Sequence, residues 1–262
     1  MRQARLGPLC GSGGWPPAHC IDHKGLERVG RSASGAFAPA PDAQILIENG
    51  GGKVGEMTAS EFTLRADDGA NLFARRWLPE GRARAVLQIA HGLSEHSGRY
   101  ARLAAALNEA GYAVYANDHR GHGPKAAAAD LGHFADEGGW DKVVADLWTL
   151  NRAIAAEQPG VPIVFLGHSL GSFLGRGFIA RHSDALAGAA LSGSSGKPPA
   201  IAALGRLVAR EERLRLGKRG KSDPLFAMWF GGFNKPFSPA RTPFDWLSRD
   251  EKEVDAYIAD PL

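Results

Sequence analysis

The stretch with the clearest chemical potential is Gly167-His168-Ser169-Leu170-Gly171, in which two glycines bracket a serine. It follows the apolar run Ile163-Val164-Phe165-Leu166, which has the composition of a strand buried on both faces, and it precedes a small-residue and apolar segment that we predict to be a helix. Strand, sharp turn and helix make a nucleophile elbow, where a strained turn presents the serine hydroxyl at the upper edge of a sheet. We therefore predict that Ser169 is a nucleophile, with a plain strand-to-helix turn as the alternative.

Strands and helices alternate around this turn. The first two predicted strands, separated by Asp67-Asp68-Gly69-Ala70, form a hairpin. The alternation that follows predicts an α/β fold with a mostly parallel sheet, helices on both faces and ligands beyond the carboxyl ends of the strands. The predicted strands are 61–66, 71–78, 85–90, 112–116, 163–166 and 186–191, and the predicted helices are 100–110 and 140–156.

Composition excludes several classes of function. A formal charge of +3 from 31 basic and 28 acidic residues is too small to indicate nucleic-acid binding. No apolar run is long enough to span a membrane, and the first residues lack the apolar centre of a signal peptide, so we expect a cytoplasmic protein. Cys10 and Cys20 lie ahead of the predicted globular region, so neither a disulfide framework nor a thiolate metal site is expected there.

The N-terminal residues 1–56 are rich in glycine and proline and carry no sustained helix or strand period. Regular patterning begins at Met57. We predict that residues 1–56 are either a disordered extension or a leader translated ahead of the natural start.

Two further motifs accompany the elbow, in a fixed order. They are His91-Gly92-Leu93-Ser94-Glu95-His96-Ser97-Gly98-Arg99-Tyr100 and Asn117-Asp118-His119-Arg120-Gly121-His122-Gly123. With the Ser169 elbow, they resemble the monoacylglycerol lipase and lysophospholipase group of α/β-hydrolases, the serine aminopeptidase S33-type family. The resemblance runs from about Met57 to the last residue.

The resemblance implies a carboxylic ester hydrolase that works through an acyl-enzyme on Ser169, needs no cofactor and takes a small-molecule lipid ester. It also implies an oxyanion hole formed by the backbone N–H groups of Leu93 and Leu170. The pattern of the residues agrees, because such donors are expected in the turn after the third strand and directly after the nucleophile.

By the same resemblance, residues 57–196 are the N-terminal part of an α/β-hydrolase core and residues 197–262 are part of a helical cap, or lid. The cap carries an amphipathic helix and aromatic residues that either bind an acyl chain or fill a core. Its basic stretch is either a solvated face or a patch for anionic lipid, which leaves peripheral membrane contact open. The aromatic residues are Phe226, Trp229, Phe230, Phe233, Phe237, Phe244 and Trp246, and the basic ones are Arg206, Arg210, Arg213, Arg215, Lys218, Arg219 and Lys221.

A serine hydroxyl needs a histidine to take its proton, and the histidine needs a carboxylate to fix its tautomer. In this fold the chain order is serine, acid, histidine. After Ser169 the sequence holds only His182, which the helical rise carries away from the serine, and no strand ends in a carboxylate. We therefore expect a truncated hydrolase that lacks the acid and base, is inactive as it stands, and leaves 186–191 as an open sheet edge without the C-terminal strands and helix.

The upstream histidines offer two alternatives. His119 and His122 with Asp118 could mimic a metal site, but no H-x-x-x-H spacing supports one, and we expect no metal. As possible bases, His91 belongs to the oxyanion turn and His168 should point away from Ser169.

Two classes of function stay open. One is an ester hydrolase of glycerol or lysophospholipid esters. The other is a non-catalytic fragment or pseudoenzyme that at most binds lipid. Within the enzyme class an aminopeptidase fits less well. It would need an acidic anchor for a substrate amine, and nothing in the cap singles out one of the carboxylates there, which include Asp223, Asp245 and Glu251.

Overall fold

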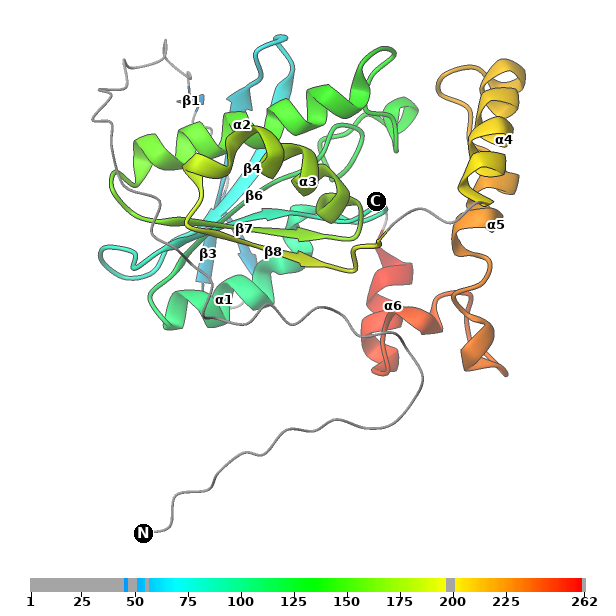
Figure 1. The fold of residues 1–262 in the computed structure, drawn as a ribbon. Coiled ribbons are helices and arrows are strands. Elements are labelled where there is room, and N and C mark those ends of the chain that lie inside the picture. Colours follow the sequence, from blue (N-terminus) through cyan, green and yellow to red (C-terminus); the bar gives the residue numbers. More distant parts are fainter. Residues whose placement is uncertain (1–44, 47–50, 55–56, 197–200, 261–262) are drawn as a thin grey trace, which may run out of the picture. The chain divides into compact units, whose positions relative to one another are not determined.

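The fold is built on one sheet whose strands follow the apolar runs of the sequence (Figure 1). The computed structural model describes residues 45–46, 51–54, 57–196 and 201–260. The strands are β1 (Ile45–Leu46), β2 (Gly51–Val54), β3 (Met57–Arg65), β4 (Asn71–Trp77), β5 (Val86–Ala90), β6 (Ala113–Asn117), β7 (Ile163–His168) and β8 (Gly188–Ser192).

The strand order is β1-β3-β4-β6-β5-β7-β8, and β2 also pairs with β3. Strands β6, β5, β7 and β8 are parallel, and those from β1 to β4 pair antiparallel. The predicted strands are confirmed with small shifts at their ends, the largest at β3, which begins four residues before the predicted 61–66. Because β1 and β2 lie ahead of Met57, pairing with β3 gives part of the predicted extension a regular structure; most of residues 1–56 lies outside the described residues.

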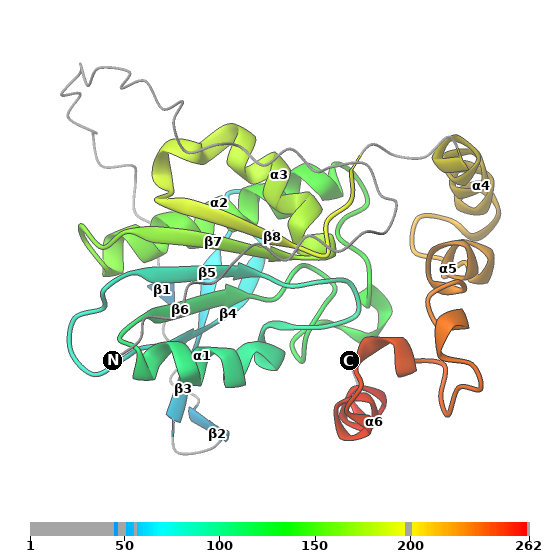
Figure 2. The same ribbon diagram turned by 60° about the horizontal axis from the view of Figure 1, so that its bottom comes forward.

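Helices cover both faces of the sheet, as Figure 2 shows for α1 on one side and α2 with α3 on the other. Helix α1 contacts β4 and β6, whereas α2 and α3 contact β5, β6 and β7 from the opposite face. These helices are α1 (Ala101–Glu109), α2 (Gly139–Glu157) and α3 (Leu170–His182).

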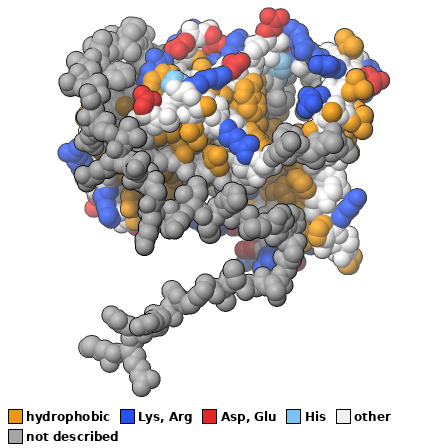
Figure 3. Space-filling view, viewed as in Figure 1, with side chains coloured by type: hydrophobic (Ala, Val, Ile, Leu, Met, Phe, Trp, Pro, Cys, Tyr) orange, Lys and Arg blue, Asp and Glu red, His pale blue; other side chains and the backbone are white. Residues whose placement is uncertain are grey.

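The segment from 201 to 260 is helical and exposes most of its apolar side chains. It contains α4 (Ile201–Leu216), α5 (Asp223–Phe230), α6 (Glu251–Ala259) and the short 3₁₀ helices η4 (Lys235–Phe237) and η5 (Asp245–Leu247). Of its described apolar side chains, only Val254 is fully buried. Figure 3 shows apolar and basic side chains next to one another at the surface over α4 and α5. The assignment of residues 197–262 to a cap stays a prediction.

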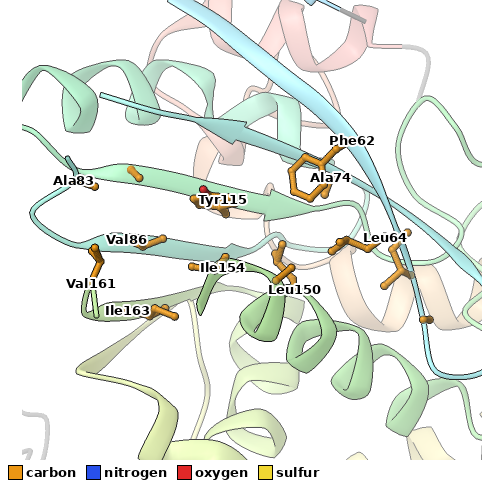
Figure 4. Close-up of a cluster of buried hydrophobic side chains, with 14 residues drawn as sticks. Phe62, Leu64, Ala74, Ala83, Val86, Tyr115, Leu150, Ile154, Val161 and Ile163 are labelled. Atoms are coloured by element: carbon orange, nitrogen blue, oxygen red, sulfur yellow. The ribbon is translucent and has the colours of Figure 1, made fainter. Parts of the chain in front are cut away.

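The largest part of the core lies between α2 and the sheet (Figure 4). Leu150 and Ile154 of α2 are fully buried against strand residues that include Val86 and Ile163. In the same cluster, Tyr115 of β6 packs edge to face against Phe62 of β3, with ring centroids 6.5 Å apart. Each such side chain contributes about 2 kcal/mol by leaving water, so this layer fixes the position of β5 and β7 relative to α2.

Buried polar bonds fix the register of the same layer. The Gln88 amide of β5 donates to the Leu147 carbonyl at 2.8 Å and accepts from the Asn151 amide at 2.8 Å. Nearby on α2, the guanidinium of Arg120 forms two 2.7 Å bonds to Asp146, and it also binds Asp68. Burial raises the pKa of Asp146, whereas hydrogen bonding to Arg120 lowers the pKa of Asp68. Arg120 therefore ties the loop after β6 to α2 and to the β3–β4 hairpin.

Strand β8 is the last strand of the sheet in the described residues, and it is exposed. Ala189, Ala190 and Ser192 are exposed, and Leu191 is 38% exposed. One side of β8 pairs with β7. The open edge expected for 186–191 is thus present in the part of the chain that is described. Among the described helices, none has both the length and the apolar composition needed to cross a bilayer.

We predict that Arg120→Met destabilises the fold by about 3 kcal/mol, because it leaves the buried Asp146 carboxylate without its partner. Urea unfolding at neutral pH measures the effect. The difference from wild type should narrow as the pH is lowered, because protonation removes the buried charge of Asp146. Arg102→Met, which breaks an exposed pair with Glu253, is the control and should change stability less. An equal loss for both variants would contradict the prediction.

We also predict that the 262-residue chain self-associates through β8, since an open and apolar edge pairs with other chains. Size-exclusion chromatography should show that Ala190→Lys lowers the associated fraction. Ala106→Lys adds the same charge at an exposed position of α1 and should have no effect. A monodisperse wild-type chain would refute this prediction.

Candidate active site

Ser169 lies in the turn between β7 and α3, in a strained conformation. Its φ of 49° and ψ of −115° are unusual for a residue with a side chain. The Ser169 N–H donates to the Ser192 carbonyl of β8 at 2.8 Å, and the Ser172 hydroxyl donates to the Ser169 carbonyl at 2.6 Å. These bonds hold the turn from both sides and leave the Ser169 side chain half-buried.

The two glycines of the motif are required by close packing of backbone on backbone. A Cβ on Gly167 would lie 2.5 Å from the Gly171 carbonyl oxygen, and a Cβ on Gly171 would lie 2.6 Å from that of His91 and collide with that of Ala90. Real Cβ atoms do not approach so closely. The elbow and the first turn of α3 therefore rest directly on the end of β5.

The Gly92-Leu93 turn follows β5 and lies beside Ser169. A Cβ on Gly92 would be 3.3 Å from the Ser169 Cβ. The Gly92 N–H donates to the Glu95 carboxylate, which also accepts from the Tyr100 hydroxyl at 3.0 Å. The structure thus brings together the predicted nucleophile and the turn that carries Leu93, while Leu170 begins α3, where an N–H has no acceptor within the helix.

His91 and His119 hold each other's backbone at this edge. The His119 N–H donates to His91 Nε2 at 2.9 Å, and His119 Nε2–H donates to the His91 carbonyl at 3.0 Å. The rings lie with centroids 3.9 Å apart. Burial lowers the pKa of His91 well below its usual range and the pKa of His119 to about 3, so both are neutral at physiological pH.

Asp118 connects the two motifs a second time. Its carboxylate accepts from the Ser97 N–H at 2.7 Å and lies 3.7 Å from the Arg75 guanidinium, which also donates to the Ser97 hydroxyl at 2.8 Å. Burial raises the pKa of Asp118. Asp118 and His119 therefore both bond to the segment that follows β5, Asp118 to Ser97 and His119 to His91. Within the described ranges, no group of three or more His, Cys, Asp or Glu residues is arranged to hold a metal ion.

The described histidines bond to groups other than the nucleophile. No hydrogen bond of the described residues joins a histidine ring to the Ser169 hydroxyl. The exposed His168 lies 3.3 Å from the Ser192 hydroxyl, and His96 bonds Asp260 at 3.0 Å. His182, predicted to be a surface residue, is half-buried at the end of α3, where it stacks on Trp148 with centroids 4.1 Å apart.

Residues 81–262 match the family described as serine aminopeptidase, S33. The chain belongs to this family. It is 30% identical over 214 residues to a monoacylglycerol lipase of Mycolicibacterium smegmatis, an alignment that covers 78% of this chain and 65% of the relative. It is 31% identical over 200 residues to a monoglyceride lipase of Rattus norvegicus, covering 74% and 57%. This S33 chain thus spans about three fifths of the length of the curated relatives it matches.

Solved structures agree with the family assignment. A thermostable carboxyl esterase from Bacillus coagulans, solved with glycerol, is 30% identical with a TM-score of 0.67, over 78% of this chain and 66% of the esterase. A lipase in an open form is 31% identical with the same TM-score and coverage. The predicted α/β-hydrolase fold, of the monoacylglycerol lipase type, is confirmed.

No individual role was predicted for Glu95, Tyr100 or Ser172. The role of Glu95 could have been predicted from its spacing, because a carboxylate three residues after a glycine can reach back to the glycine N–H, as in a helix capping box. The role of Ser172 could also have been predicted, because a serine hydroxyl early in a helix can donate to the carbonyl three residues before it. The reciprocal bonds of His91 and His119 could not have been predicted from the sequence, since they depend on β5 and β6 being neighbours in the sheet.

We predict that Gly171→Ala destabilises the protein by about 3 kcal/mol or prevents folding, because the added methyl group collides with two backbone carbonyls. Thermal melting measures the loss. Gly188→Ala is the matched control, since a Cβ there meets no atom within 4 Å. Equal melting temperatures for the two variants would show that the elbow is not packed against β5.

Proposed function

We propose that this S33-family protein is a carboxylic ester hydrolase of the monoacylglycerol lipase and lysophospholipase type, with Ser169 as the nucleophile. The observation that carries the proposal is the strained turn of Ser169 beside the Gly92-Leu93 turn. The identity to curated monoacylglycerol lipases supports a lipid ester as the substrate. In the proposed reaction Ser169 Oγ attacks the ester carbonyl, and the backbone N–H groups of Leu93 and Leu170 stabilise the oxyanion.

We further propose that the residues present here lack the acid and base of the triad. The support is that the histidines of the core are bonded elsewhere and that burial holds the pKa of His91, His119 and His122 below the usual range. A base must accept the serine proton in the transition state. On this proposal the chain turns over esters at close to the background rate.

An aminopeptidase activity has less support. Asp245 is occupied by the Thr242 hydroxyl and by the N–H groups of Arg241 and Thr242, and Glu251 faces Arg241 at 4.0 Å. These carboxylates are used in local structure. The non-catalytic alternative is a fragment or pseudoenzyme that binds lipid. Both alternatives use the apolar surface of 201–260 to bind lipid, but only the hydrolase requires Ser169 to be reactive.

We propose peripheral membrane contact through α4. Leu204, Leu207 and Leu214 are 53%, 61% and 89% exposed and share one side of the helix by their spacing. Arg206, Arg210 and Arg213 are exposed on another side. The rest of the basic stretch is partly paired, for example Lys218 with Glu137 at 3.3 Å. An apolar stripe beside a row of arginines is typical of helices that lie on anionic membranes.

Imidazole in solution can replace a missing base and so tests the proposed function. With p-nitrophenyl butyrate, the Ser169 Oγ–acyl bond forms, the bond to p-nitrophenolate breaks, and imidazole takes the serine proton. We predict near-background hydrolysis without imidazole, since losing triad groups costs on the order of a millionfold. With imidazole, mass spectrometry should show one butyryl group on Ser169, and Ser169→Ala should abolish it.

Two outcomes would contradict this proposal in different ways. Rapid turnover without imidazole that depends on Ser169 would show that a base is present. No acylation of Ser169 at any imidazole concentration would favour the pseudoenzyme.

Co-sedimentation with vesicles tests the membrane proposal. We predict that the chain binds phosphatidylglycerol vesicles more than phosphatidylcholine vesicles and that Leu204→Asp with Leu207→Asp lowers binding at least fivefold, as burial of each leucine contributes about 1 kcal/mol. Leu103→Asp, at a 40% exposed position of α1, is the control and should leave binding unchanged. Equal binding by all three proteins would refute membrane contact through α4.

A further inference from the structure

His91 has a tautomer that its neighbours determine. Its ring is fully buried at the end of β5, and its Nε2 accepts a hydrogen bond from the His119 main-chain N–H at 2.9 Å. A backbone N–H can only donate, so Nε2 carries no proton. The proton of the neutral ring is therefore on Nδ1, which lies 2.8 Å from the Gly92 carbonyl oxygen and donates to it.

The Gly92 carbonyl and the Leu93 N–H are the two ends of one planar, trans peptide and point in opposite directions. A bond that turns the carbonyl toward the buried His91 ring therefore turns the Leu93 N–H away from that ring. The preceding peptide is held as well, because the Gly92 N–H donates to Glu95. Both peptide planes around Gly92 are thus anchored, directly beside Ser169. Within the described part of the chain, the Leu93 N–H donates no hydrogen bond to another backbone group.

We propose that His91 is a positioning residue, whose Nδ1–H fixes the Gly92–Leu93 peptide so that the Leu93 N–H faces the oxyanion formed at Ser169. The inference rests on the proposed function, since it needs an oxyanion at that place. His119 acts one step further back. By occupying His91 Nε2 with its own N–H, it keeps the proton on Nδ1, which links the motif after β6 to the turn after β5.

Two substitutions separate the two ring nitrogens. His91→Asn keeps a donor near the position of Nδ1 and loses the acceptor for His119. His91→Gln keeps an acceptor near the position of Nε2 and loses the donor to Gly92. In the imidazole-assisted acylation of Ser169, the loss of one oriented oxyanion donor should slow His91→Gln about 100-fold, whereas His91→Asn should stay within about tenfold of wild type. Melting temperatures of both variants report any general damage to the fold.

A second readout needs no chemistry at Ser169. The ¹⁵N resonance of the Leu93 amide responds to the hydrogen bond on the Gly92 carbonyl, because the two atoms share one peptide. We expect this resonance to shift in His91→Gln and to stay near the wild-type position in His91→Asn.

The outcomes distinguish the inference from the function on which it rests. An unshifted Leu93 resonance in His91→Gln, or equal acylation rates in the two variants, would overturn the positioning role of His91. A variant that is slow only in proportion to its lower melting temperature would also overturn it. If wild type is not acylated while the Leu93 resonance shifts as expected, the function of Ser169 fails and the control of the peptide by His91 is upheld.

Discussion

The site depends on the direct contact between the backbone of the elbow and the backbone at the end of β5. Gly167 and Gly171 have no room for a Cβ, because a Cβ on Gly171 would meet the carbonyls of Ala90 and His91 and one on Gly167 would meet the carbonyl of Gly171. This contact presses the start of α3 against the sheet and leaves Ser169 in a conformation that a free chain would avoid. The cost of that strain is offset by the packed layers on both faces of the sheet, where Leu150 and Phe178 are fully buried on one face and Ala104 and Val114 on the other.

Around the elbow, buried polar groups orient the loops. Asp118 holds the loop at Ser97, Arg120 holds Asp68 and Asp146, and His91 and His119 hold each other's backbone. Burial favours the neutral forms of the two histidines, so their hydrogen bonds keep a fixed direction over the physiological pH range.

The segment from 201 to 260 contacts the rest of the described chain in a different way. Val254 is its one fully buried apolar side chain among those described, and several of its contacts are exposed ion pairs, such as Lys218 with Glu137, Arg102 with Glu253 and Arg219 with Asp136. Exposed ion pairs contribute little and are screened by salt. The attachment of this segment should therefore be weaker than that of α1, α2 or α3.

The sequence by itself determined the elements that carry their own local pattern. Continuous apolar runs identified β5, β6 and β7, helical spacing identified α1 and α2, and the glycines flanking Ser169 identified the elbow. Strands β1 and β2 were not predicted. Ile45-Leu46 is too short an apolar run to indicate a strand, and Gly51-Gly52-Lys53-Val54 has no strand pattern and becomes a strand only by pairing with β3. The tertiary structure alone decided that His91 meets His119, 28 residues away, and that the Ser169 N–H bonds the Ser192 carbonyl of β8. Such contacts follow from the order of strands in the sheet, and strand order leaves no periodic trace in the chain because it is set by packing between distant segments.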